Sequence, residues 1–258
     1  MTIWIAIVLG IVQGLTEFLP VSSSGHLVLF QQIFDIDVDC LLFDIVVHLG
    51  TLVAVLVVFR KSVLEILKHP FCEKSQKLVF ATIPTVIIAL LFKDFFKASF
   101  SGDFLFVGFI VTAVMMFFAD YSCKHNYQYK SLTYGGAIVM GLFQGFAILP
   151  GISRSGSTMT SALVQGVRRN ESAEFSFLMS IPAIFGSLMF EILDIGSTTS
   201  NISAVAMIFG FVFSAVSGYV AIKFMLKVIK KAKFVWFGVY LVVLSVILIL
   251  NQFVFGWF

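Results

Sequence analysis

The chain has 258 residues, of which 59% are hydrophobic and only 12% are charged. This composition excludes a soluble globular protein and predicts an integral membrane protein with several transmembrane helices. The formal net charge of +3 does not indicate nucleic-acid binding, because the basic residues fall in short segments between apolar runs. Cys40, Cys72 and Cys123 are too far apart for a metal or redox motif, so we expect free thiols.

Residues 1–33 do not form a simple transmembrane span. Their apolar sequence is broken by Gln13-Gly-Leu-Thr-Glu17-Phe-Leu-Pro20-Val-Ser22-Ser23-Ser24-Gly25-His26, which gathers turn formers and ionisable groups. A helical arm of about 12 residues rises only about 18 Å, which reaches the middle of a bilayer. We therefore expect a re-entrant helix–loop–helix hairpin whose polar tip is buried in protein or lines a water-filled cavity.

Three full-length spans are expected after this hairpin, near residues 41–59, 78–93 and 104–120. The first of them contains Asp44 and His48, which are four residues apart and so lie on one face of a helix. Two interpretations of this pair stay open: it lines the cavity of a functional site, or it packs as a structural pair.

Residues 133–165 repeat the organisation of the N-terminal hairpin. Two short apolar segments flank Gln144-Gly-Phe-Ala-Ile-Leu-Pro150-Gly151-Ile-Ser153-Arg154-Ser155-Gly156-Ser157-Thr158. We expect a second re-entrant hairpin here, followed by three spans near residues 176–193, 204–222 and 235–256.

The two hairpins are also related in sequence. The pairs that share a spacing of 131 residues are Gly10 and Gly141, Gln13 and Gln144, Gly14 and Gly145, Ser24 and Ser155, and Gly25 and Gly156. We expect one integral membrane domain over residues 1–258, with internal repeats of about 1–120 and 133–256. Because each repeat has three spans, an odd number, the second must be inverted relative to the first. The hairpin tips then meet near the midplane of the membrane.

Charge in the loops predicts the orientation. Residues 60–77 and 223–233 each contain five lysines or arginines and should face the cytoplasm, which places both termini outside. The expected fold class is therefore an all-α polytopic membrane protein with six transmembrane helices, two re-entrant hairpins and an inverted-topology repeat.

The segments Glu17-Phe-Leu-Pro-Val-Ser-Ser-Ser-Gly-His26 and Pro150-Gly-Ile-Ser-Arg-Ser-Gly-Ser-Thr158 resemble the paired signature of the bacitracin-resistance undecaprenyl-diphosphate phosphatase family. The resemblance covers the whole chain in length and span layout. It implies a multi-pass enzyme of the bacterial cytoplasmic (inner) membrane, with a site that opens to the periplasmic or outer side. Its implied activity converts undecaprenyl diphosphate to undecaprenyl phosphate and phosphate, recycling the lipid carrier for peptidoglycan synthesis and conferring bacitracin resistance. The first motif has Gln13 where the family has Glu or Gln, so a mechanism with two glutamates is weakened.

A diphosphate headgroup requires cations and oriented hydrogen-bond donors. We expect Arg154 to be the cationic clamp, because a guanidinium pairs bidentately with phosphate. The predicted phosphate-binding residues are Ser22, Ser24, Gly25, Ser153, Arg154, Ser155, Gly156 and Thr158. The alternative role for Arg154 is a structural pair with a carboxylate or a helix C-terminus.

Glu17 is a candidate metal ligand and catalytic residue, with Gln13 one helical turn earlier as a second ligand. Oxygen ligands favour Mg²⁺ or Ca²⁺ over zinc. The alternative is that Glu17 forms a structural bridge with Arg154.

Ser23 and His26 complete the predicted catalytic set. In one route, His26 is the general base that activates Ser23 for attack on phosphorus. In the other, a metal-bound water attacks and His26 orients it. The sequence leaves both routes open.

Two alternative functions can be compared with the sequence, a lipid transporter and an acid phosphatase. A transporter or flippase of polyprenyl phosphate lipids fits an inverted repeat as well as an enzyme does. An acid-phosphatase site would need a histidine where this chain has Thr160, so that interpretation fails. The expected partners are a polyprenyl diphosphate lipid and the bilayer, without nucleic acid; the oligomeric state stays open, a homodimer included.

Overall fold

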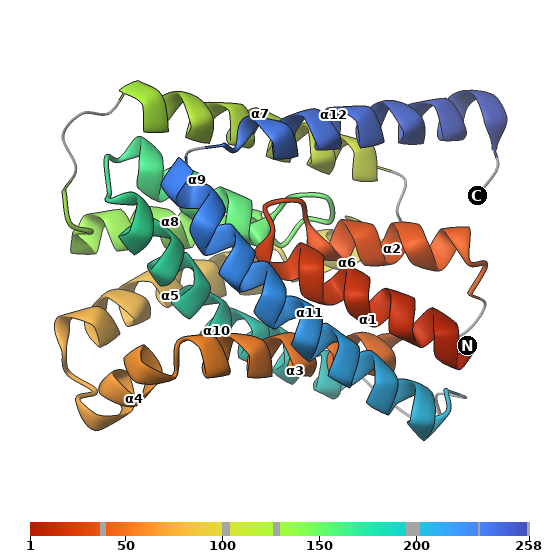
Figure 1. Cartoon of the computed structure of the whole chain (residues 1–258), viewed down its shortest axis with the longest axis horizontal. Coiled ribbons are helices and arrows are strands. Elements are labelled where there is room, and N and C mark those ends of the chain that lie inside the picture. Colours follow the sequence, from red (N-terminus) through yellow and green to blue (C-terminus); the bar gives the residue numbers. More distant parts are fainter. Residues whose placement is uncertain (37–39, 100–103, 126–129, 195–201, 232, 257–258) are drawn as a thin grey trace.

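The computed structural model describes the chain except for residues 37–39, 100–103, 126–129, 195–201, 232 and 257–258. The connections predicted to face the outer side of the membrane are therefore only partly described. Residue 232, in the basic segment 223–233, is also not described. In chain order the helices are α1 (Ile3–Phe18), α2 (Ser23–Ile33), α3 (Leu41–Val58), α4 (Arg60–Lys68), α5 (Glu73–Leu91), α6 (Lys93–Ser99), α7 (Leu105–His125), α8 (Tyr134–Phe146), α9 (Arg154–Val164), α10 (Arg169–Asp194), α11 (Ala204–Lys231), α12 (Val235–Leu250) and the π-helix Asn251–Phe255 (Figure 1).

Six of these helices, α3, α5, α7, α10, α11 and α12, are long and apolar enough to cross a membrane. They coincide with the six predicted spans, so the all-α polytopic class is confirmed. Each of the arms α1, α2, α8 and α9 has only 11 to 16 residues. At about 1.5 Å per residue, even the longest arm falls short of a hydrocarbon core of roughly 30 Å.

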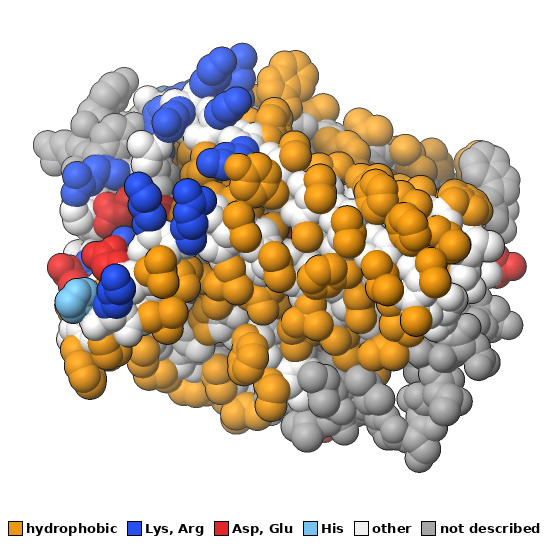
Figure 2. Space-filling model, turned by 60° about the horizontal axis from the view of Figure 1, so that its bottom comes forward, with side chains coloured by type: hydrophobic (Ala, Val, Ile, Leu, Met, Phe, Trp, Pro, Cys, Tyr) orange, Lys and Arg blue, Asp and Glu red, His pale blue; other side chains and the backbone are white. Residues whose placement is uncertain are grey.

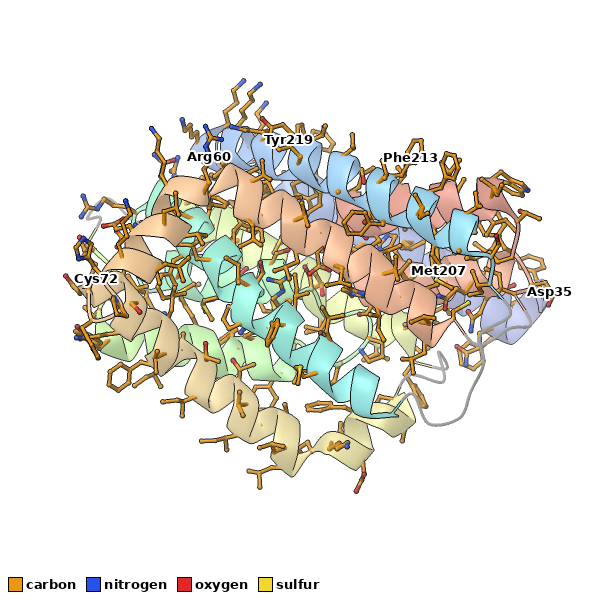
Figure 3. All side chains as sticks on the ribbon, turned by 90° about the horizontal axis from the view of Figure 1, so that it is seen from below. Asp35, Arg60, Cys72, Met207, Phe213 and Tyr219 are labelled. Carbon is orange, nitrogen blue, oxygen red and sulfur yellow. The ribbon has the colours of Figure 1, made fainter. Side chains whose placement is uncertain are left out.

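The surface divides into a basic end and a broad apolar side. Figure 2 shows Lys and Arg side chains gathered at one end, while hydrophobic side chains cover most of the rest of that face. Arg60 and Cys72 lie at the basic end, and Asp35 lies at the opposite end (Figure 3). Apolar residues such as Leu91, Ile208 and Val216 are strongly exposed, as expected of side chains that contact lipid.

The arms of the two hairpins pack against helices that are distant in sequence. α1 lies along α11, and α8 lies along α5. The contacts are between backbones: a Cβ added at Gly10 would lie 2.5 Å from the Gly210 carbonyl oxygen, and one at Gly141 would lie 2.0 Å from the Ala81 carbonyl oxygen. Small residues permit this close approach, which is typical of helix pairs in membranes.

Gly141→Ala is expected to lower the apparent melting temperature, because the added methyl group must displace the Ala81 backbone. Overpacking of this kind costs about 1–3 kcal/mol. Gly135→Ala, on the same helix, is the matched control because nothing lies within 4 Å of its added Cβ. Thermal unfolding of both variants in detergent checks this. Equal melting temperatures would contradict the backbone contact.

One helix was not expected. α4 lies within residues 60–77, which the sequence suggested only as a basic cytoplasmic segment. It is amphipathic: Leu64 and Leu67 share it with Arg60, Lys61 and Lys68. Both leucines are largely exposed, and no residue of α4 is buried, so this short helix is suited to the surface of a membrane.

Candidate active site

The tips of the two hairpins meet inside the helix bundle. At the first tip, Ser22 caps α2 in a left-handed conformation (φ 70°), and its Oγ accepts a hydrogen bond from Gly25 N at 3.4 Å. At the second tip, Ser153 caps α9 and accepts from Gly156 N at 3.1 Å. The tips touch directly, because the Ser155 hydroxyl donates to the Leu19 carbonyl at 3.1 Å.

The second tip is held against α7. Gly151 has φ +84°, and an added Cβ would lie 2.6 Å from the Leu105 carbonyl oxygen, so only glycine fits there. Thr112 Oγ1 donates to Gly151 O and accepts from Ser153 N, both at 2.9 Å. Sequence analysis missed this role, because Thr112 is a single hydroxyl residue in a predominantly apolar span.

Glu17 is the centre of the site. It is buried near the end of α1, and its Oε2 accepts from Ser23 Oγ at 2.5 Å and from Gln13 Nε2 at 3.0 Å. Its Oε1 accepts a short hydrogen bond from Arg154 Nη2, which also makes the two residues an ion pair. The Glu17 carboxylate thus joins the two sequence motifs. The Glu17–Arg154 bridge, predicted as the structural alternative, is present.

Arg154 retains donor capacity in this arrangement. Its side chain is mostly buried, and its Nη1 has no hydrogen-bond partner. A buried guanidinium nitrogen without a partner costs free energy, which an anion bound beside it would offset. The position therefore fits a phosphate oxygen.

His48 lies next to this centre and Asp44 lies further along α3. His48 Nε2 is 4.0 Å from Glu17 Oε2, while His48 Nδ1 is 2.6 Å from the Asp44 carbonyl oxygen. The Asp44 carboxylate accepts from Gln31 Nε2 at 3.0 Å. His48 thus lies next to Glu17. The Asp44 carboxylate links α3 to α2 through its hydrogen bond with Gln31.

The other predicted phosphate-binding hydroxyls mostly have partners within the protein. Thr158 Oγ1 donates to Arg154 O at 2.9 Å and lies 2.6 Å from Ser176 Oγ. Among the described residues, Ser24 Oγ has one hydrogen-bond partner, Ser22 Oγ at 3.4 Å, and Ser24 is half-buried. These residues build the two tips, and of this set Ser24 has the fewest contacts.

His26 is buried and hydrogen-bonded at both ring nitrogens, but not to Ser23. Its Nδ1 is 2.7 Å from the Ser22 carbonyl oxygen, and its Nε2 is 2.7 Å from Tyr240 Oη. A carbonyl only accepts, so Nδ1 carries a proton, and in a neutral ring Nε2 accepts from the tyrosine hydroxyl. Tyr240, on α12, was missed by sequence analysis because it stands alone in an apolar span.

Tyr240→Phe is expected to lower phosphate release about three- to tenfold without abolishing it. The change removes one hydrogen bond to His26, which contributes about 0.5–1.5 kcal/mol, and leaves the ring in place. Tyr219→Phe, on the exposed face of α11, is the control. Steady-state kinetics would contradict a positioning role if the two variants matched the unsubstituted protein.

The described residues include no cluster of three or more His, Cys, Asp or Glu side chains that could hold a metal ion. Glu17 and Gln13 nevertheless offer oxygen ligands together, and Gln13 Oε1 is buried without a hydrogen-bond partner. Mg²⁺ is commonly held by one or two protein oxygens together with substrate phosphates and water. These two residues fit a metal ion of that kind.

The fold defines a polytopic integral membrane protein, and its two hairpin tips bring Glu17, Ser23 and Arg154 together in one polar site between the helices. Residues 6–247 match the family model described as bacitracin resistance protein BacA, and the chain belongs to this family.

Similar proteins cover nearly the whole chain. An undecaprenyl-diphosphatase of Carboxydothermus hydrogenoformans is 44% identical over 251 residues, which are 96% of each chain. One of Halothermothrix orenii is 41% identical over 97% of this chain and 98% of its own. Undecaprenyl-diphosphatase 4 of Bacillus cereus is 38% identical over 96% of each.

Proposed function

We propose that the chain is an undecaprenyl-diphosphate phosphatase. It hydrolyses undecaprenyl diphosphate to undecaprenyl phosphate and phosphate, which recycles the lipid carrier for peptidoglycan synthesis and confers resistance to bacitracin. The names of its relatives support this substrate. The observation that carries the chemistry is the contact of Ser23, Glu17 and Arg154 where the two tips meet.

In the proposed reaction, the terminal phosphate of the substrate binds to Arg154, whose Nη1 is available for it. Ser23 Oγ attacks the terminal phosphorus and gives its proton to Glu17, which already accepts its hydrogen bond. The bond between phosphorus and the bridging oxygen breaks, and undecaprenyl phosphate leaves. Water then attacks the phosphoserine and the bond between Ser23 Oγ and phosphorus breaks. Glu17 returns its proton to Ser23 Oγ, and phosphate leaves with the protons of the water.

This assignment changes the role expected of His26. Because Ser23 is bonded to Glu17 and His26 to Tyr240, Glu17 is the better candidate for the general base. His26 holds the Ser22 carbonyl and so positions the turn that presents Ser23. Direct attack by water, with Ser23 binding phosphate, remains the alternative route.

A divalent metal, Mg²⁺ or Ca²⁺, would be held by Glu17 and Gln13 together with the diphosphate. It would neutralise charge that develops on the phosphate oxygens. Ser22, Ser24 and the backbone of the two caps would supply further donors to the phosphate.

The proposed setting is the bacterial cytoplasmic membrane, with the basic end inside and the site open toward the outer side. In this proposal the two hairpins are re-entrant and belong to an inverted repeat, with the site at mid-depth. The shortness of the arms α1 and α8 supports the mid-depth position. Packing between the repeats supports it as well, because α1 of the first repeat packs on α11 of the second, and α8 of the second packs on α5 of the first. A flippase would use the same architecture and is the second candidate.

We expect purified protein to release phosphate from undecaprenyl diphosphate in detergent, and EDTA to abolish the release. Mg²⁺ or Ca²⁺ added in excess should restore it. The control is a heat-unfolded sample. Release that is unaffected by EDTA would remove the metal from the mechanism. Movement of polyprenyl phosphate across vesicles without any phosphate release would favour the flippase.

A further inference from the structure

A polar cavity lies at the basic end of the molecule, away from the site around Glu17. Its volume is about 810 Å³, and it lies between α5, α10, the end of α11 and the segment before α8. It shares no residue with the site around Glu17, and the proposed reaction does not use it.

The wall of this basic-end cavity is charged, with an excess of positive charge. Its basic residues are Lys74, Lys77, Arg168, Arg169 and Lys230. Its acidic residues are Glu73, Glu171 and Glu174. Five cations against three carboxylates leave an excess of two positive charges, which attracts an anionic phosphate group.

Several of the cations are fixed in place by neighbours. Lys74 pairs with Glu174 at 3.3 Å, and Lys77 pairs with Glu73 at 2.5 Å. Arg169 Nη2 donates to the Cys123 carbonyl at 2.5 Å, which orients its guanidinium. Lys230 is exposed and makes no ion pair with any residue that the structure describes, so its ammonium group is available to a ligand.

The cavity also has an apolar part and lies beside a surface helix. Leu132, Phe175 and Leu178 contribute to its lining. Ser62 of α4 donates to Glu174 at 2.9 Å, which joins the amphipathic helix to the cavity wall. The exposed leucines of α4 and Phe71, which is 85% exposed, place this region where lipid headgroups meet water.

We propose that the basic-end cavity binds the phosphate of an anionic lipid headgroup from the leaflet at the basic end. Basic pockets between transmembrane helices are known to recognise such headgroups. The lysines and arginines of the cavity wall bind the phosphate group, and the apolar lining contacts the first carbons of the acyl chains. Free inorganic phosphate offers the same chemistry, so the test separates the two sources. The proposal does not depend on the catalytic assignment.

The test is native mass spectrometry of the intact protein in nanodiscs that contain equal amounts of phosphatidylglycerol and phosphatidylcholine. We expect retention of phosphatidylglycerol. Lys230→Gln should weaken this retention about fivefold, because it removes from the cavity wall a cation that forms no ion pair with any described residue. Lys227→Gln removes the same charge from the same helix outside the cavity, and it should change nothing.

A second arm adds inorganic phosphate at millimolar concentration. If phosphate does not displace the lipid, the headgroup is the ligand; if it does, and also binds the lipid-free protein, the cavity is a site for free phosphate. Equal retention of both lipids, or equal loss in the Lys230 and Lys227 variants, would overturn the proposal. Thermal unfolding of both variants verifies that they are folded, and their catalytic assay is scored separately.

Discussion

Arg154→Ala is expected to lower kcat/KM for phosphate release by about 10²–10³-fold or more. The substitution removes the guanidinium bonded to Glu17, and with it a donor that can meet the charge that develops on phosphate. Arg154→Lys keeps the charge but loses bidentate pairing, so its activity should fall between those of the alanine variant and the unsubstituted protein. Arg60→Ala, at the exposed start of α4, is the control and should retain full activity.

Stability has to be separated from catalysis in this experiment. Removing one partner of a buried ion pair costs about 3–5 kcal/mol, because the other charge is left without compensation. The double variant Glu17→Gln with Arg154→Ala removes both charges and should recover much of that stability, but no activity. A purified, folded Arg154→Ala protein with more than a tenth of normal activity would show that the guanidinium does not clamp the substrate.

Ser23→Ala should have the largest effect, a loss of about 10⁴-fold or more, as expected when a nucleophile is removed. Its hydroxyl donates to Glu17 at 2.5 Å, so the proton acceptor is already in contact. Ser24→Ala is the matched control. Its hydroxyl belongs to the next residue and is hydrogen-bonded to Ser22 Oγ rather than to Glu17, so a loss of less than about tenfold is expected.

The route of attack can be read from the same two variants. Rapid quenching of the reaction should trap phosphate on Ser23 in the unsubstituted protein and in Ser24→Ala, but not in Ser23→Ala. If Ser23→Ala keeps substantial turnover and no phosphoserine forms in any variant, water is the nucleophile, and Ser23 serves only to bind phosphate.

Hydropathy predicted the six spans because lipid-facing helices are apolar over their full length. The boundaries shifted where tertiary contacts extend a helix beyond its apolar part. α5 begins at Glu73 rather than near residue 78, since its first turn is held by ion pairs such as Lys74 with Glu174. α4 was missed because it has only nine residues, and its four apolar positions do not stand out in a segment rich in charged residues.

For the site, sequence analysis identified the two motifs but not the pairing within them. Glu17, Ser23 and Arg154 do lie together, whereas His26 was expected beside Ser23 and instead contacts Tyr240. A spacing of three residues on one helix places both side chains near the tip but does not fix which partner each one takes. Tyr240 and Thr112 come from distant spans and carry no local pattern, so only the packing of α12 and α7 could reveal them.

The packing of α1 along α11 has a consequence for biosynthesis. Phe18 and Ala204 are 186 residues apart, so at roughly 5–20 residues per second the ribosome needs about 10–40 s to make the partner of α1 after α1 itself. Until α11 has been made, Gly10 has no Gly210 backbone to pack against. Until Arg154 has been made, Glu17 lacks its ion-pair partner. The native packing of α1 can therefore form only after α11 has been made, so the first hairpin lacks its main partner during most of the synthesis of the chain.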